Sequence, residues 1–262
     1  MSLRSGASRV AVAEEKMTIG LVVPCFNEAG RWSDSYWSEI LALPDVQLLF
    51  VNDGSSDATP DQLERTVAGT SSSVLHLSRN SGKAEAVRQG MLTQLCQHDY
   101  GAVGYLDADG AFNATDILDV IASYRRQVEG GPYEAVWSSR VALAGRDIQR
   151  SGSRHYIGRV IATLVSAGHG QIPYDTQSGY KLFAPDERLR EALRVPFRTR
   201  WLFELELLAR WKGRNAQALR IWEEPLNYWH DVPGSKIKGN ESLRIIRELA
   251  VVKQEQRRLA KR

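Results

Sequence analysis

The stretch Val103-Gly104-Tyr105-Leu106-Asp107-Ala108-Asp109-Gly110 joins an apolar strand to two carboxylates that are separated by one small residue. Side chains alternate along a strand, so Asp107 and Asp109 are expected to point to the same side. Two carboxylates held there repel each other unless a cation lies between them, and a hard divalent ion shared with a phosphate meets that need. On its own the motif is equally typical of a strand-end turn, because Asp and Gly are common turn residues.

Strand and helix patterns alternate on both sides of this stretch. The expected strands cover residues 19–24, 47–51, 74–77, 102–106, 135–138, 179–184 and 218–223. The expected helices cover residues 32–43, 83–95, 153–167, 202–211 and 241–258, with one that is capped by Asp57 or Thr59 and ends near 68, and one that is capped by Thr115 and ends near 127. This alternation predicts an α/β fold with right-handed crossovers and a mostly parallel central sheet flanked by helices.

The composition is that of an ordinary globular protein, with 43% hydrophobic and 25% charged residues, so most of the 262-residue chain is expected to form one large domain. We expect a disordered leader over residues 1–16, the domain over 17–230, and a loop with an amphipathic basic helix over 231–262. A net charge of +3 is too small to argue for a nucleic-acid partner.

The two cysteines and the hydropathy pattern favour a cytoplasmic protein. Cys25 and Cys96 belong to no metal-type spacing and are expected to be reduced core thiols. No apolar run approaches the roughly 18–20 residues that a membrane-spanning helix needs. The terminal helix carries a one-sided apolar stripe of Leu243, Ile246, Leu249, Val251 and Val252. It is expected either to lie on an anionic membrane surface or simply to pack against the domain.

Polar segments follow each of the first four expected strands. They read PCFNE at 24–28, NDGSSD at 52–57, NSGK at 80–83 and DADG at 107–110. Open α/β sheets bind ligands at the carboxyl ends of their strands, so these segments are expected to converge on one crevice. A single polar segment is more often only a loop, but four of them on one edge indicate a binding site.

These segments resemble, in order and spacing, the motifs of the family 2 glycosyltransferases, which have the GT-A fold. The motifs stand here as PCFNE, NDGSSDAT, GKAEA and DAD. The resemblance implies a metal-dependent enzyme whose nucleotide-sugar-binding residues are Pro24, Asn27, Glu28, Asp53, Ser55, Lys83, Asp107 and Arg140. Asp53 would accept the imino N–H of uracil or guanine, and Lys83 would reach a phosphate or hydroxyl. Asp109, with Asp107 beside it, would hold Mg²⁺ or Mn²⁺ on the diphosphate.

A second block narrows the resemblance. The segments DTQSGYKLF at 175–183 and RWLFELELL at 200–208 are similar to those of polyprenyl-phosphate sugar synthases, and most similar to the dolichyl-phosphate β-glucosyltransferases. The metal motif of that group continues as DADGA, as it does here to Ala111, which favours a UDP-sugar over GDP-mannose. The chain departs from the group where Ala84-Glu85 replaces a Gly pair and where Glu204 replaces an Asp.

Two kinds of acceptor are compatible with this block. A phosphate monoester carries a charge of about −1.5 to −2 at pH 7, so it is already a nucleophile and needs cations around it. The acceptor-binding residues would then be Arg150, Arg154, Gln177 and Lys236, with His230 as a further contact. A hydroxyl acceptor would need a carboxylate base instead. The residues expected near the reaction itself are Asp175, Lys181 and Glu204, of which Asp175 and Glu204 are the candidate bases.

The resulting hypothesis is an inverting glycosyltransferase that moves a hexose, glucose in the first instance, from a UDP-sugar to a polyprenyl phosphate or a related membrane-borne acceptor. One alternative is a family 2 enzyme that acts on a hydroxyl in glycolipid, pigment or polysaccharide biosynthesis. Another is a non-catalytic nucleotide-sugar binder. A sugar nucleotidyltransferase is disfavoured, because it would show a G-x-G-T-R loop after the first strand and this chain has PCFNE there.

Overall fold

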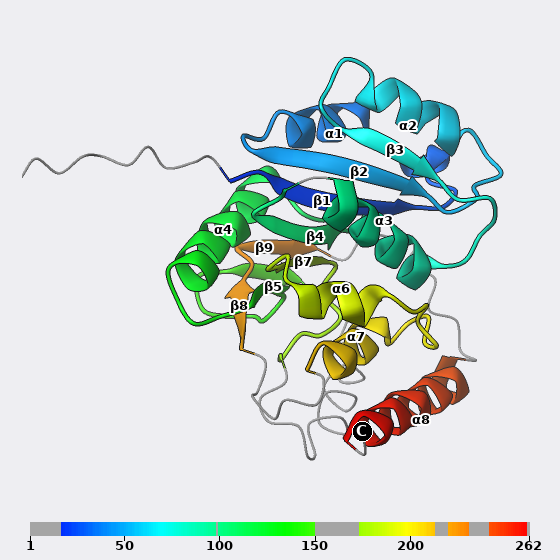
Figure 1. The fold of residues 1–262 in the computed structure, drawn as a ribbon. Helices are drawn as coiled ribbons and strands as arrows, with labels where there is room; N and C mark the ends of the chain where they lie inside the picture. The colour runs from blue at the N-terminus through cyan, green and yellow to red at the C-terminus, as the bar shows by residue number, and fades with distance from the viewer. Residues whose placement is uncertain (1–16, 98, 150–172, 213–219, 231–240, 261–262) are drawn as a thin grey trace, which may run out of the picture.

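A computed structural model describes residues 17–97, 99–149, 173–212, 220–230 and 241–260 (Figure 1). The leader 1–16, the helix expected over 153–167 and the acceptor-binding candidates Arg150, Arg154 and Lys236 lie outside the described residues.

In the described part of the chain, one sheet contains seven strands, ordered as β3 (Ser73–His76), β2 (Val46–Asn52), β1 (Ile19–Cys25), β4 (Ala102–Leu106), β7 (Tyr180–Phe183), β5 (Ala135–Ser139) and β8 (Ile221–Pro225). All neighbouring strands are parallel except that β7 is antiparallel to both β4 and β5. The α/β class and the mostly parallel sheet are therefore confirmed. Because β7 runs backwards, it begins at the edge where the parallel strands end, and so brings the segment before it to that edge.

Alternating residues of the central strands pack into two apolar layers, because both faces of the sheet are covered. Leu21 and Val23 of β1 face the cluster that includes α1 (Asp34–Leu41), α2 (Thr59–Val67) and α4 (Ala114–Tyr124). Val22 faces the cluster that includes α3 (Lys83–Gln97), α6 (Glu187–Leu193) and α7 (Phe203–Lys212). Figure 1 shows α8 (Glu241–Ala260) lying beside α7, with Val252 packed on Leu202 and Leu205.

Several element boundaries differ from the expected ones. The cap of α4 is Asn113, whose side chain accepts the N–H of Asp116 at 2.7 Å, so the prediction of Thr115 was wrong. The helix continues as a π-helical turn over Arg125–Glu129. The N-cap of α2 is Ala58, although Asp57 still accepts the N–H of Thr59 at 3.0 Å.

Four short elements were not predicted from the sequence. They are the 3₁₀ turn Ala29–Arg31, α6 and the two strands of a small parallel sheet, β6 (Asp147–Gln149) and β9 (Tyr228–His230). Cys25 is a buried free thiol, as expected, whereas Cys96 is exposed near the end of α3, so the prediction of a core position for Cys96 was wrong.

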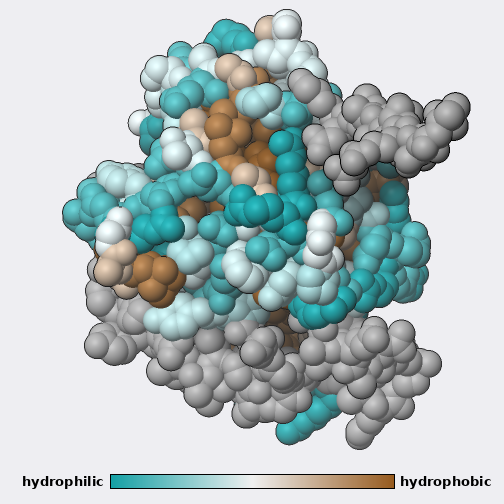
Figure 2. All heavy atoms as spheres, turned by 90° about the vertical axis from the view of Figure 1, so that its left-hand side faces the viewer, coloured by the Kyte–Doolittle hydropathy of each residue, from teal (hydrophilic) through white to brown (hydrophobic). Residues whose placement is uncertain are grey.

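Few large hydrophobic side chains are exposed on the surface of the described residues. Figure 2 shows one face that is largely hydrophilic, with hydrophobic atoms gathered in a few places. Large hydrophobic side chains are exposed at Leu118, Leu143, Val195 and Tyr228. None of the described helices is both long and apolar enough to cross a bilayer.

Candidate functional site

A cleft opens at the carboxyl edge of the sheet, where the polar segments were expected to converge. Its volume is about 180 Å³, several times the roughly 30 Å³ that a water molecule occupies in the liquid. It is lined by Pro24, Cys25, Phe26, Glu28, Arg31, Asp53, Lys83, Ala86, Asp107, Ala108 and Asp109. Segments that follow β1, β2 and β4 and the start of α3 thus meet at one place, and six of the predicted site residues line it.

The acidic pair lies in this cleft beside a lysine. Nζ of Lys83 is 2.6 Å from Oδ1 of Asp107, and the two side chains are 38% and 28% exposed, so both remain accessible to a ligand. Burial lowers the pKa of Lys83, but the charges of Asp107 and Glu204 outweigh burial and raise the pKa above its ordinary value. Lys83 is therefore a cation at the N-terminus of α3.

The donor set fits a divalent cation. Burial and the neighbouring charge of Asp107 raise the pKa of Asp109, so the pair resists carrying two negative charges without a cation. No group of three metal-ligating His, Cys, Asp or Glu side chains occurs among the described residues. Two carboxylates leave most positions of a six-coordinate Mg²⁺ open, and Mg²⁺ commonly fills such positions with water and substrate phosphate.

The DTQSGYK segment packs against Asp107 of the acidic pair. The N–H of Asp107 donates to the carbonyl of Gly179 at 2.9 Å. A Cβ atom at position 179 would lie 2.2 Å from Oδ2 of Asp107, so only glycine leaves the carboxylate where it is. The glycine of the second block is thus required by its close approach to the carboxylate of the first.

Asp53 lines the cleft and also orders the loop that leads to Lys83. Its two oxygens accept the N–H groups of Ser81 and Gly82, each at 2.7 Å. Burial raises its pKa, although these two hydrogen bonds act in the opposite direction. The predicted contact between Asp53 and a base stays a prediction, since both oxygens already hold the backbone of this loop.

The PCFNE segment is braced by the NDGSSDAT segment. Asn27 adopts φ 53°, and its N–H donates to Oγ of Ser55 at 3.0 Å. Oγ1 of Thr59 accepts the N–H groups of Glu28 at 2.8 Å and Ala29 at 3.1 Å. Asn27 and Ser55 were predicted to bind the nucleotide sugar. The structure places them in this brace and outside the lining of the cleft.

Thr59→Val is expected to lower the free energy of unfolding by about 2 kcal/mol, because the buried N–H of Glu28 loses its acceptor and the N–H of Ala29 keeps only its 3.2 Å contact with Asp57. Thr59 is fully buried, so water does not replace the lost hydroxyl easily. Urea denaturation measures the change. Thr70→Val is the control, since Thr70 is exposed and water can replace its contacts with the carbonyl of Val67 and the N–H of Ser72, and it should change stability by less than about 0.5 kcal/mol.

A buried polar cluster lies next to the cleft. Nζ of Lys181 donates to the hydroxyl of Tyr105 at 2.9 Å and to the carbonyl of Ser178, and the hydroxyl of Tyr105 donates to Glu204 at 3.1 Å. Lys83 and Lys181 lie 5.5 and 5.2 Å from the centroid of the Tyr105 ring. Burial lowers the pKa of Lys181 to about 8 and raises the pKa of Glu204. Lys181 and Glu204 are not part of the lining of the cleft, so their direct action on a substrate stays a prediction.

Asp175 forms a bidentate ion pair with Arg140. Nε and Nη2 of Arg140 donate to the two oxygens of Asp175 at 2.7 and 2.8 Å, and the backbone N–H of Arg140 adds a third contact at 3.0 Å. The guanidinium also lies 5.0 Å from the ring centroid of Trp229. A base at this position would have to leave a bidentate ion pair. Gln177 is half-buried, and its Nε2 makes no hydrogen bond within the described residues.

Arg31 lines the cleft but was not predicted from the sequence. It belongs to a 3₁₀ turn, Ala29–Arg31, and its side chain forms two contacts with Glu28, one of them at 2.6 Å. Hydrogen bonding to Glu28, and more weakly the charges of Asp109 and Asp107, raise the pKa of Arg31. The only sequence signal was its i,i+3 spacing from Glu28.

Comparisons with known proteins agree with this geometry. A family model described as glycosyl transferase family 2 matches residues 21–170. Dolichyl-phosphate beta-glucosyltransferase of Saccharomyces cerevisiae is 27% identical over 92% of this chain and 75% of its own length, and the Drosophila melanogaster protein of that name is 30% identical over 84% and 69%.

A crystal structure of glucosyl-3-phosphoglycerate synthase from Mycobacterium tuberculosis, in complex with Mg²⁺ and UDP, superposes with a TM-score of 0.61 at 16% identity. The superposition covers 92% of this chain and 79% of that one. At this identity the likeness is one of fold.

Proposed function

The chain belongs to glycosyl transferase family 2, and on that basis we propose that it transfers glucose from UDP-glucose to a polyprenyl phosphate. The observation that carries the proposal is a cleft containing Lys83, Asp107 and Asp109. It occurs in a chain similar to dolichyl-phosphate beta-glucosyltransferases over most of its length. The acidic pair and the lysine suit a diphosphate, and the relatives supply the sugar and the acceptor class.

On the donor side, Asp109 and Asp107 would hold Mg²⁺ or Mn²⁺, which when bound supplies charge neutralisation for the departing UDP. Lys83 would move from Asp107 to a phosphate oxygen, a short step because its side chain is already partly exposed. Asp53 would present its remaining lone pairs to the base, and the loop of Pro24, Asn27 and Glu28, braced by Ser55, would form the wall beside the nucleoside.

On the acceptor side, the proposal is a single in-line displacement with inversion at the anomeric carbon. A phosphate nucleophile needs no base, which accords with Asp175 being only 4% exposed and paired with Arg140. Arg140 would face the acceptor phosphate, together with Gln177 and with Arg150, Arg154 and Lys236, which are proposed from the sequence.

A polyprenol offered as the acceptor in place of its phosphate should give no transfer. Transfer to the alcohol and not to the phosphate would contradict this assignment.

We propose that the terminal helix contacts the cytoplasmic face of an anionic membrane peripherally, which would bring the cleft close to a lipid-borne acceptor. Its outward residues Arg247, Lys253, Arg257 and Arg258 are exposed and basic, a pattern that attracts anionic lipid headgroups. Its inner face, with Leu249 and Val252, packs against α7.

The donor is tested by the thermal stability of the protein with UDP-glucose and with GDP-mannose, each with Mn²⁺. A ligand present at about 100 times its Kd stabilises the folded protein by about 2.7 kcal/mol, so UDP-glucose at such a concentration should raise the melting temperature by several degrees. Chelation of the metal should remove most of that shift. Stabilisation by GDP-mannose alone would contradict the donor assignment.

A further inference from the structure

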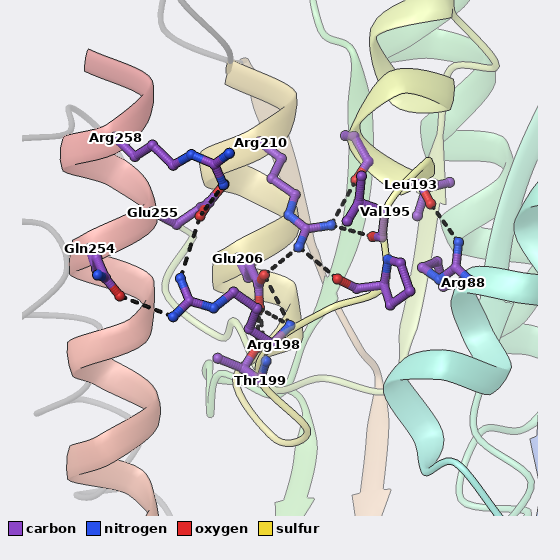
Figure 3. A network of polar contacts seen from close by, with 12 residues as sticks. Arg88, Leu193, Val195, Arg198, Thr199, Glu206, Arg210, Gln254, Glu255 and Arg258 are labelled. Atoms are coloured by element: carbon purple, nitrogen blue, oxygen red, sulfur yellow. Dashed lines mark hydrogen bonds and ion pairs between the residues drawn. The ribbon is translucent and has the colours of Figure 1, made fainter. Parts of the chain in front are cut away.

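The segment Arg198–Leu202, which leads into α7, is held by two buried carboxylates from different helices. Glu206 of α7 accepts the N–H groups of Arg198, at 3.0 Å, and Thr199, at 2.9 Å, as Figure 3 shows. Glu248 of α8 accepts the N–H groups of Trp201 and Leu202 at 2.9 and 2.8 Å, both on the same oxygen, Oε2. Glu206 is fully buried and Glu248 is 7% exposed, so these contacts are sheltered from water.

Arg200 lies between the two clamped pairs of amides, and its side chain reaches Gly82 in the loop that precedes α3. A Cβ atom at Gly82 would lie 3.0 Å from Nη2 and 3.1 Å from Nε of Arg200, so the guanidinium covers that glycine closely. Gly82 has φ +92°, a conformation that favours glycine. Its N–H is one of the two that Asp53 holds, and Lys83 follows directly.

The terminal helix is fixed to α7 independently of Glu248. Val252 packs on Leu202 and Leu205. Arg198 reaches α8 through Gln254 at 3.0 Å and Glu255 at 3.8 Å (Figure 3). Glu248 is therefore presented to the start of α7 by a helix that has its own docking contacts.

We propose that Glu248 is a positioning residue of the donor site, through which α8 sets the placement of Arg200 and thereby the order of the loop that presents Lys83. Clamped amides at Trp201 and Leu202 fix the backbone on one side of Arg200, and Glu206 fixes it on the other. The guanidinium then packs on Gly82 and confines the loop of Ser81 and Gly82 against Asp53. A carboxylate at the N-terminus of α7 also complements the helix dipole. For the identity of the ligand, the proposal rests on the proposed function.

The test compares Glu248→Ala, Glu248→Gln and Glu255→Ala. Glutamine keeps one oxygen that can accept both amides, so it should preserve the clamp. Glu255 is the matched control because it is equally buried on the same helix face and touches Arg198 without binding the amides that precede α7. Two readouts are used: hydrogen exchange at the amides of Ser81 and Gly82 without ligand, and the Kd of UDP with Mn²⁺ by titration calorimetry.

Glu248→Ala is expected to speed exchange at both amides and to weaken UDP binding by about tenfold, within the range of coupling between distinct sites. Glu248→Gln and Glu255→Ala should remain within about twofold of the unmodified protein, a difference of roughly 0.4 kcal/mol. Arg200→Ala, which leaves α8 intact and changes an exposed side chain, should reproduce the faster exchange.

Unchanged exchange at Ser81 and Gly82 in Glu248→Ala or Arg200→Ala would overturn the proposal, as would an equal effect of Glu255→Ala. Failure of the unmodified protein to bind UDP would instead contradict the proposed function. The exchange measurement would still decide whether Glu248 orders the loop.

Discussion

Asp109→Asn is expected to slow glucosyl transfer by about a thousandfold, which corresponds to roughly 4 kcal/mol of transition-state stabilisation. The amide keeps the shape of the side chain and removes the negative charge that would hold Mg²⁺ or Mn²⁺ on the diphosphate. The fold should tolerate the change, because within the described residues the Asp109 carboxylate accepts one hydrogen bond, from the N–H of Ala111 at 3.2 Å. Steady-state rates across a Mn²⁺ titration measure the effect.

Asp99→Asn, which removes an exposed carboxylate at the opposite end of β4 from the motif, serves as the control and should leave the rate unchanged. Asp107→Asn should also impair transfer, with an additional effect on Lys83, whose nearest carboxylate it removes. An Asp109→Asn variant with an unaltered rate and metal dependence would show that the pair is not the metal site.

Asp175→Asn is expected to lower the free energy of unfolding by about 3 kcal/mol, because it removes the carboxylate that forms a bidentate ion pair with Arg140, which is only 13% exposed. The main expected effect is therefore on stability. Well below the melting temperature, any fall in activity should come mainly from weaker binding of the donor or the acceptor. Urea denaturation and a comparison of kcat with KM measure both.

The double variant Arg140→Gln with Asp175→Asn distinguishes the ion pair from a catalytic base. Removing both charges should restore a large part of the stability, since the two members of the buried ion pair are neutralised together. If Asp175→Asn instead kept its full stability and lost kcat by orders of magnitude, Asp175 would act as a base and a hydroxyl acceptor would be favoured.

The parallel part of the fold could be predicted because each strand is a short apolar run that ends in polar turn residues. The stretch at 102–106 was placed to the residue, and β1 and β2 within one residue at each end. The reversed direction of β7 could not be predicted, because the four residues YKLF are all buried and their pattern does not depend on the direction of the strand. Only its pairing with β4 and β5 determines it.

The positions of Lys83, Asp107 and Asp109 in the cleft were predictable, because polar segments that follow parallel strands meet at the carboxyl edge of the sheet. Arg31 was missed because a single turn of 3₁₀ helix brings it to the cleft, and no sequence pattern predicted that turn. Asn27 and Ser55 belong to a recognisable motif, but the motif does not reveal that they bond each other. Side chains that maintain a binding loop and side chains that contact the ligand look alike in a sequence.

The central claim is tested most directly by identifying the lipid product formed from UDP-glucose, Mn²⁺ and polyprenyl phosphate. Mass spectrometry with ¹H NMR should show a polyprenyl phosphate that carries one glucosyl unit in the β configuration, absent when Asp109→Asn replaces the unmodified protein. A lipid fraction with no glucosyl phosphate, together with glucose on a hydroxyl acceptor, would contradict the account.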